Sequence, residues 1–268
     1  NGAAPGGTTS FEPGSAVSIV FVTGDLSIEA TGTVTAVSGN QLLAFGHQLF
    51  NFGPIHLPLA GTKIYATLPS LMSSTKMSTA TGIVGTFLQD RMSGTLGDLT
   101  VKPNLIPVRL NITSPFHDPA SYSFQMADDP AFANMLPFYL RIALIQAMNA
   151  ARLGGELNSS RLLGAITLTD GRKIHIDDFF TSQQRFGFLA TGMDAVSASD
   201  LVTVLLGTVM VNDFSGPRVK SVDLDMHTVA DARYAVVESV WQDKTAVKPG
   251  DDLTLTVRLR DNNEKLSN

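Results

Sequence analysis

One histidine stands where this chain could hold a catalytic base. The apolar run Leu42–Phe45 leads directly into Gly46 and His47. An imidazole at the end of a strand, after a glycine that permits a tight turn, can accept a proton from a serine hydroxyl. A lone histidine can equally close the strand by bonding to a backbone carbonyl. The pattern therefore offers a candidate general base and leaves both interpretations open.

Two further places carry side chains that could act near His47. Asp90 and Arg91 follow a strand-like segment that ends at Phe87. Adjacent opposite charges usually form a surface ion pair of small energetic value, but these two could instead brace the loop that carries His47. His56 could share a metal ion with His47, yet no third ligand stands at a suitable spacing. We therefore predict neither a metal site nor a cofactor.

Composition excludes several classes of protein. The 268 residues are 44% hydrophobic and 16% charged, with a net charge of −5 and no cysteine. Such a chain buries a sizeable core as one large domain or two unequal ones. Without a concentrated basic face it is a poor partner for nucleic acid. Without cysteine it has no disulfide framework, thiolate zinc site or cysteine nucleophile.

The first part of the chain reads as short strands separated by glycine and proline. Residues 1–13 are rich in glycine, proline and threonine, which predicts a linker. Close-spaced short strands over residues 15–115 predict an antiparallel barrel or a strongly curved sheet, with His47 at a strand end. The expected strands are 16–22, 28–37, 42–45, 63–68, 82–87 and 106–112.

A helix is expected in the middle of the chain. Asp129-Pro130 resembles an N-cap with proline in the first turn, and Leu136–Leu153 is nearly all apolar. Arg141, Asn149 and Arg152 fall in one quadrant of the helical wheel and should reach solvent or a partner. These polar residues argue against a membrane span and favour a mostly buried helix.

Alternating patterns return after this helix. Arg161–Asp178 predicts a hairpin with its turn at Asp170-Gly171. Ser197 and Asp200 resemble a capping box that opens a second helix over Leu201–Val211. From Val219 the strand spacing is typical of the opening of an immunoglobulin-like sandwich.

The expected fold class is thus mainly β with a helical segment. The domains we predict are a β domain over 14–125, an α+β extension over 126–218, and the start of an immunoglobulin-like module over 219–268. The low-complexity start and the unfinished β pattern at the end predict an internal piece of a longer protein.

Three segments together resemble a known family. Thr31–Val37 (TGTVTAV), Leu42–His47 (LLAFGH) and Val84–Leu99 (VGTFLQDRMSGTLGDL) are similar to the peptidase domain of the SpoIVB family, trypsin-like serine peptidases of sporulation signalling. The resemblance implies a trypsin-like antiparallel barrel with His47 as catalytic base. It also implies an extracellular or periplasmic bacterial protein, with a protein partner or peptide substrate.

The nucleophile of that family has no clear counterpart. The family serine lies in a Gly-x-Ser-Gly-Ser-Pro turn, whereas Ser215 stands in NDFSGPRV without the preceding glycine or the second serine. The orienting aspartate is equally unassigned among Asp118, Asp128 and Asp194. We therefore expect a polar or backbone partner for the His47 imidazole and no serine beside it.

The preferred interpretation is a binding or assembly module that has lost proteolysis. One alternative is an active serine endopeptidase that uses His47 with Ser215 or another serine. A second alternative is a structural subunit of a large extracellular assembly.

Overall fold

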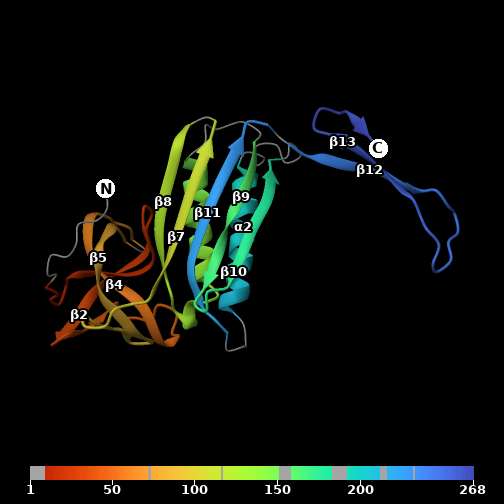
Figure 1. Ribbon diagram of the computed structural model, residues 1–268. Coiled ribbons are helices and arrows are strands. Elements are labelled where there is room, and N and C mark those ends of the chain that lie inside the picture. The colour runs from red at the N-terminus through yellow and green to blue at the C-terminus, as the bar shows by residue number, and fades with distance from the viewer. Residues whose placement is uncertain are drawn as a thin grey trace.

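The computed structural model describes residues 10–71, 74–115, 117–150, 158–182, 192–211, 216–231 and 233–268. The protein is mainly β, as the sequence predicts. Figure 1 shows three parts: a small barrel near the N-terminus, a tall sheet backed by helices, and a projecting C-terminal sheet.

The barrel is antiparallel and closed. Its strands follow the order β1-β2-β3-β6-β5-β4, and β4 pairs with β1 at Leu59–Gly61 to complete the circle. The side chains of Leu42, Leu59 and Phe87 are fully or almost fully buried in its core. Its strands are β1 (Ala16–Gly24), β2 (Ile28–Ser38), β3 (Gln41–Ala44), β4 (Gly53–Leu68), β5 (Thr75–Arg91) and β6 (Gly94–Asp98).

The tall sheet continues from the same first strand. Val22–Gly24 of β1 pairs with β8, and the order runs on as β8-β7-β11-β9-β10. All these neighbours are antiparallel except β7 and β11, which are parallel. The strands are β7 (Leu105–Ser114), β8 (His117–Ala127), β9 (Ser159–Leu168), β10 (Lys173–Thr181) and β11 (Val219–Val229).

Two strand predictions need correction. The segment 106–112, expected in the barrel region, forms β7 of the tall sheet, so the barrel ends with β6. The segment after Val219, expected to open a separate immunoglobulin-like module, forms β11 between β7 and β9. Its alternating apolar residues suit any half-buried strand, and the pattern does not say which partner buries them.

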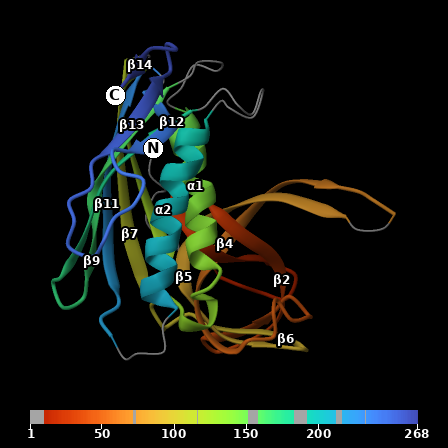
Figure 2. The same ribbon diagram turned by 90° about the vertical axis from the view of Figure 1, so that its right-hand side faces the viewer.

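Two helices cover one face of the tall sheet (Figure 2). Asp129 is an N-cap, as its sequence predicts, but it caps the short 3-10 helix η1 (Pro130–Phe132) and not the long helix, and α1 (Leu136–Ala150) follows separately. The expected residues 151–153 lie outside the described part of the chain. In α1, Leu140 and Leu144 are completely buried, which places them in the single core shared by barrel and sheet.

The second helix is longer than its sequence predicts. α2 spans Met193–Met210 and begins after Gly192, so the expected capping residue Ser197 lies inside the helix. By length and apolar composition α2 could cross a membrane, and one third of it is buried within the protein. It packs against α1 and against β9, β10 and β11 of the tall sheet.

The predicted hairpin is confirmed. β9 and β10 pair in register from Ser159 opposite Thr181 to Thr167 opposite Lys173, and Gly171 adopts φ 88° in the turn. A positive φ at this position favours glycine. The remaining strands, β12 (Ala235–Gln242), β13 (Leu255–Asp261) and β14 (Leu266–Ser267), form a separate sheet.

Candidate functional site

His47 lies on an exposed loop that connects β3 with β4. Its Nδ1 is 2.7 Å from the backbone oxygen of Gln48. A carbonyl only accepts hydrogen bonds, so in the neutral ring Nδ1 carries the proton and Nε2 is free to accept one. Within the described residues this backbone oxygen is the polar partner of the imidazole, and no serine hydroxyl bonds to it.

Asp90 holds the loop that carries His47. Its side chain is completely buried at the end of β5. One carboxylate oxygen accepts the Leu49 amide at 2.7 Å, and the other accepts the amides of Phe50 at 2.8 Å and Phe52 at 3.4 Å. Hydrogen bonds to an ionised acceptor are roughly twice as strong as neutral ones. Asp90 therefore braces a loop that has no sheet pairing of its own.

Arg91 plays a different part from its neighbour. It is exposed, and its Nε donates to Gln89 Oε1 at 2.9 Å. Its guanidinium lies over Gly53, where a Cβ built on the glycine would be 3.3 Å from Nη1. Arg91 thus flanks the far end of the loop and does not pair with Asp90.

The backbone of the loop is strained at its start. Phe45 has φ 73°, which is unusual for a bulky side chain, and Asn51 has φ 61°. The Phe45 ring lies over Gly32, where a Cβ would come within 2.8 Å of it, and meets the buried Phe87 edge-on at 6.0 Å. Strain of this kind persists only where packing enforces it, and it concentrates at functional sites.

An aromatic pair stands on the same loop. Phe50 and Phe52 stack at 5.5 Å between ring centroids, and both are about two-fifths exposed. Both rings pack in a T-shaped arrangement against the fully buried Phe132 of η1, with centroid distances of 5.4 Å from Phe50 and 4.9 Å from Phe52. The loop therefore presents His47 and two supported aromatic rings on a fixed backbone.

The other residues singled out in the sequence do not join this site. Ser215 lies outside the described residues. Asp118 is exposed on β8, and Asp128 pairs with Arg218 at 2.6 Å. Asp194 is buried at the start of α2. None of these three carboxylates is bonded to His47.

His56 contributes its backbone and not its imidazole. The backbone N–H of His56 donates to the buried Asp129, whose other oxygen accepts the Ala131 amide at 2.7 Å. Asp129 thus caps η1 and ties it to β4. The residues described contain no group of three histidine, aspartate or glutamate side chains that could hold a metal.

Asp194 organises a second buried polar cluster. Its carboxylate accepts the Ser160 hydroxyl at 2.6 Å and the Ser182 hydroxyl at 2.9 Å, and Ser160 also meets Thr228 at 3.0 Å. All four side chains are buried. This cluster joins the start of α2 to the tall sheet and so stabilises the fold.

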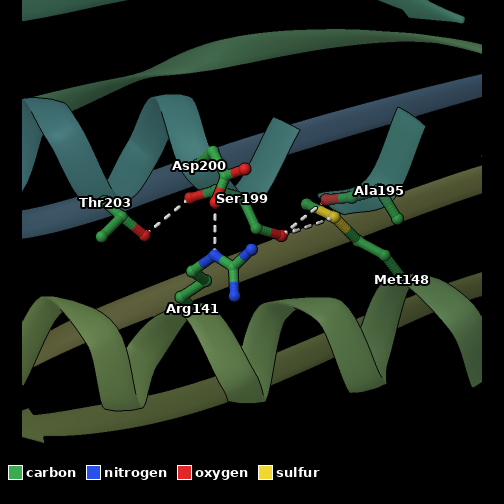
Figure 3. Close-up of polar contacts among 6 residues, drawn as sticks. All are labelled: Arg141, Met148, Ala195, Ser199, Asp200 and Thr203. Carbon is green, nitrogen blue, oxygen red and sulfur yellow. Dashed lines mark hydrogen bonds and ion pairs between the residues drawn. The ribbon is translucent and has the colours of Figure 1, made fainter. Parts of the chain in front are cut away.

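The two helices are linked by polar contacts as well as apolar ones (Figure 3). Arg141 of α1, expected to reach solvent or a partner, forms an ion pair with Asp200 of α2 within the chain. Ser199 lies between Met148 and the backbone oxygen of Ala195. Asn149, by contrast, is exposed.

Comparison of the chain with protein-family models, curated proteins and solved structures finds no match. The chemistry of the site therefore has to be judged from its geometry. The loop can offer a free imidazole nitrogen and an aromatic surface. Its buried acid is engaged by backbone amides.

Sequence reasoning missed two features that the fold reveals. The Phe50–Phe52 pair stands in an Asn-Phe-Gly-Pro context that reads only as a loop. The second feature is Glu29, whose carboxylate is buried beside a cavity. It is the one charged residue of the alternating segment Ile28–Val37, and this charge was the signal that could have drawn attention to it.

Proposed function

We propose that this chain is a binding or assembly module of a secreted bacterial protein, related to the SpoIVB-type peptidase domain. Its partner would be a protein or an extended peptide, and its surface would be the loop that carries His47, Phe50 and Phe52. The extracellular or periplasmic location and the peptidase ancestry rest on the sequence resemblance alone.

The observation that carries this proposal is the use made of Asp90. In a catalytic triad a buried carboxylate faces the histidine ring, whereas Asp90 accepts hydrogen bonds from Leu49, Phe50 and Phe52. The acid thus fixes the shape of the loop instead of orienting a base. A loop fixed in advance loses little conformational entropy on binding.

The exposed rings supply the contact surface. Aromatic side chains bury a large area with few rotatable bonds and often dominate the energy of an interface. The buried Phe132 supports Phe50 and Phe52 from behind. Both rings can therefore contact a partner without rearranging.

A second candidate is an active serine endopeptidase with His47 as general base. The hydrogen bond between His47 Nδ1 and the Gln48 oxygen favours it, because this bond leaves Nε2 ready to take a proton. Under this second candidate, Ser215 is the first serine to test as the nucleophile.

A fluorophosphonate probe separates the two candidates. The purified chain should show no labelling and no casein cleavage if it only binds. Labelling that disappears in both His47→Ala and Ser215→Ala variants would establish the peptidase instead, since loss of a triad member costs several orders of magnitude in rate.

Binding itself is tested on an array of random peptides. The Phe50→Ser/Phe52→Ser variant should lose most of the peptides that the unchanged chain retains. Phe179→Ser removes an equally exposed ring on β10 and should retain them. Equal retention by all three proteins would show that the loop is not the binding surface.

A further inference from the structure

A cavity lies where the long β4–β5 hairpin crosses β2, apart from the His47 loop. Side chains of the two layers meet directly: Thr31 Oγ1 is 2.8 Å from Ser78 Oγ, and Lys76 Nζ donates to Thr33 Oγ1 at 2.7 Å. The cavity measures about 720 Å³ and is lined by Glu29, Thr31, Tyr65, Lys76, Met77 and Ser78, among others. This volume falls within the roughly 300–1,000 Å³ of small-ligand sites.

The carboxylate of Glu29 is buried in this wall without a side-chain partner. Both of its carboxylate oxygens are buried without a well-formed hydrogen bond, and the backbone of Ala80 is the polar group close enough to lower the carboxyl pKa. Burial raises the pKa of the Glu29 carboxyl, and the nearby backbone of Ala80 offsets this only in part. Buried polar groups in native proteins are rarely left unpaired. A carboxylate without a side-chain partner beside a cavity therefore indicates a site where a ligand could supply one.

Several other polar groups in and behind the wall already have partners. Thr62 donates to Ser18 at 2.8 Å, Ser18 meets Thr31 at 3.0 Å, and Thr31 meets Ser78. Lys76 is engaged by Thr33. These hydrogen bonds hold the wall in place, and the Glu29 carboxylate is an acceptor that the cavity can offer to a ligand.

The charge of the guest follows from Glu29 and Tyr65. An ionised carboxylate is stabilised most by a positively charged donor. The Tyr65 ring already attracts one cation, since Lys63 Nζ lies 5.2 Å from its centroid. The ring is nearly two-thirds exposed and can contribute to a second contact of this kind.

We propose that this cavity binds a guanidinium or primary ammonium group, such as a peptide carries on an arginine or lysine side chain, with Glu29 as its counter-ion. The cavity is separate from the His47 loop, and the proposal stands whether or not that loop binds a partner.

Methionine methyl NMR tests the proposal directly. Met77 lines the cavity, whereas Met92 is exposed at the β5–β6 turn and serves as an internal reference. Titration with Nα-acetyl-arginine amide should shift the Met77 methyl signal saturably and leave that of Met92 in place. The isosteric but neutral Nα-acetyl-citrulline amide should bind at least about tenfold more weakly.

Two variants assign the effect to Glu29. Glu29→Gln keeps the size of the side chain and should weaken the arginine probe about tenfold or more. Glu238→Gln, a matched change on β12, should leave binding unchanged. His47→Ala should also leave it unchanged, which separates this site from the loop.

Three results would overturn the proposal. They are equal binding of both probes, undiminished binding by Glu29→Gln, and no saturable shift of Met77 by either probe. A fourth result would also overturn it. If the arginine probe binds only to the Lys76→Gln variant, the Lys76 ammonium forms an ion pair with Glu29 in the unchanged chain and occupies the site itself. Thermal melting of each variant confirms that a lost signal does not reflect unfolding.

Discussion

Asp90 in the barrel and Asp194 at the start of α2 are both completely buried, yet they hold different kinds of structure. Asp90 accepts backbone amides from an exposed loop, whereas Asp194 accepts the hydroxyls of Ser160 and Ser182 within the core. Fixing a loop in space creates a defined surface, and joining two layers of a core only secures the fold. The comparison therefore agrees with our proposal that the barrel carries the binding surface.

Backbone strain is distributed in the same way. Among the described residues, the non-glycine positions with positive φ are Phe45 and Asn51 in the His47 loop and Glu264 in the C-terminal sheet. The tall sheet and its helices contribute none within the described part of the chain. A region built only for stability has no reason to keep strained residues.

The largest effect should come from the core of the tall sheet. Leu144 is completely buried in α1, so Leu144→Asp would place a carboxylate without a partner among apolar side chains. We expect loss of the folded state, seen as loss of the cooperative thermal transition by circular dichroism and as aggregation in size-exclusion chromatography.

Gln146→Asp is the matched control, because Gln146 is exposed on the same helix. Its free energy of unfolding should stay within about 0.5 kcal/mol of the unchanged chain. A folded Leu144→Asp protein with an unchanged melting temperature would contradict the burial of α1.

Removing the loop brace should have the next largest effect. Asp90→Ala leaves the amides of Leu49, Phe50 and Phe52 without their acceptor. We expect a loss of about 2–4 kcal/mol in the free energy of unfolding, measured in urea. Amide hydrogen exchange at Leu49 and Phe50 should accelerate more than exchange in β9.

Asp98→Ala offers the comparison for this change. Asp98 is on the neighbouring β6, is only partly buried, and accepts hydrogen bonds from the amide and hydroxyl of Thr100. Its loss should destabilise the fold less than the loss of Asp90 and leave exchange in the His47 loop unaltered. If both variants changed the rate of amide hydrogen exchange in the His47 loop equally, Asp90 would have no special role in bracing it.

The sequence predicts local structure better than long-range partners. The turn at Asp170-Gly171 and the cap at Asp129 were predictable because they depend on neighbouring residues. The place of β11 was not, since its parallel partner β7 lies more than a hundred residues earlier. Alternation reveals that a strand is half buried but not what buries it.

The candidate site shows the same division. The sequence predicts His47 at a strand end, and the structure places it in the loop that follows β3. Bracing by Asp90 was one of two interpretations of its charge. The cavity beside Glu29 was not predictable, because it exists only where the β4–β5 hairpin crosses β2. Such crossings depend on strand bending, which single residues do not encode.

A smaller effect is expected at the contact between the helices. Arg141 and Asp200 are paired across α1 and α2, but the Asp200 side chain is half exposed. Pairs that are open to water contribute about 0–1 kcal/mol. A double-mutant cycle with Arg141→Met and Asp200→Asn should therefore give a coupling energy in this range. A coupling of several kcal/mol would mean that the helical layer depends on this pair as the loop depends on Asp90.

The smallest effect concerns Glu29, and it appears only as a change with pH. Burial raises the pKa of this carboxyl in the folded protein, so the folded state holds the proton more tightly than the unfolded state does. Stability contributed by Glu29 is then lost as pH rises from the ordinary glutamate pKa through the raised value. Glu29→Gln abolishes this loss.

The urea midpoint of Glu29→Gln should therefore match that of the unchanged chain below this pH window and exceed it above. Glu29 as a whole is only partly buried, so solvent screening keeps the difference modest. Saturating Nα-acetyl-arginine amide should stabilise the unchanged chain above the window, since it binds the folded state and supplies the missing partner. If the variant is instead less stable at neutral pH, the ionised Glu29 already has a partner, and the barrel half would then be as fully paired as the helix-covered sheet.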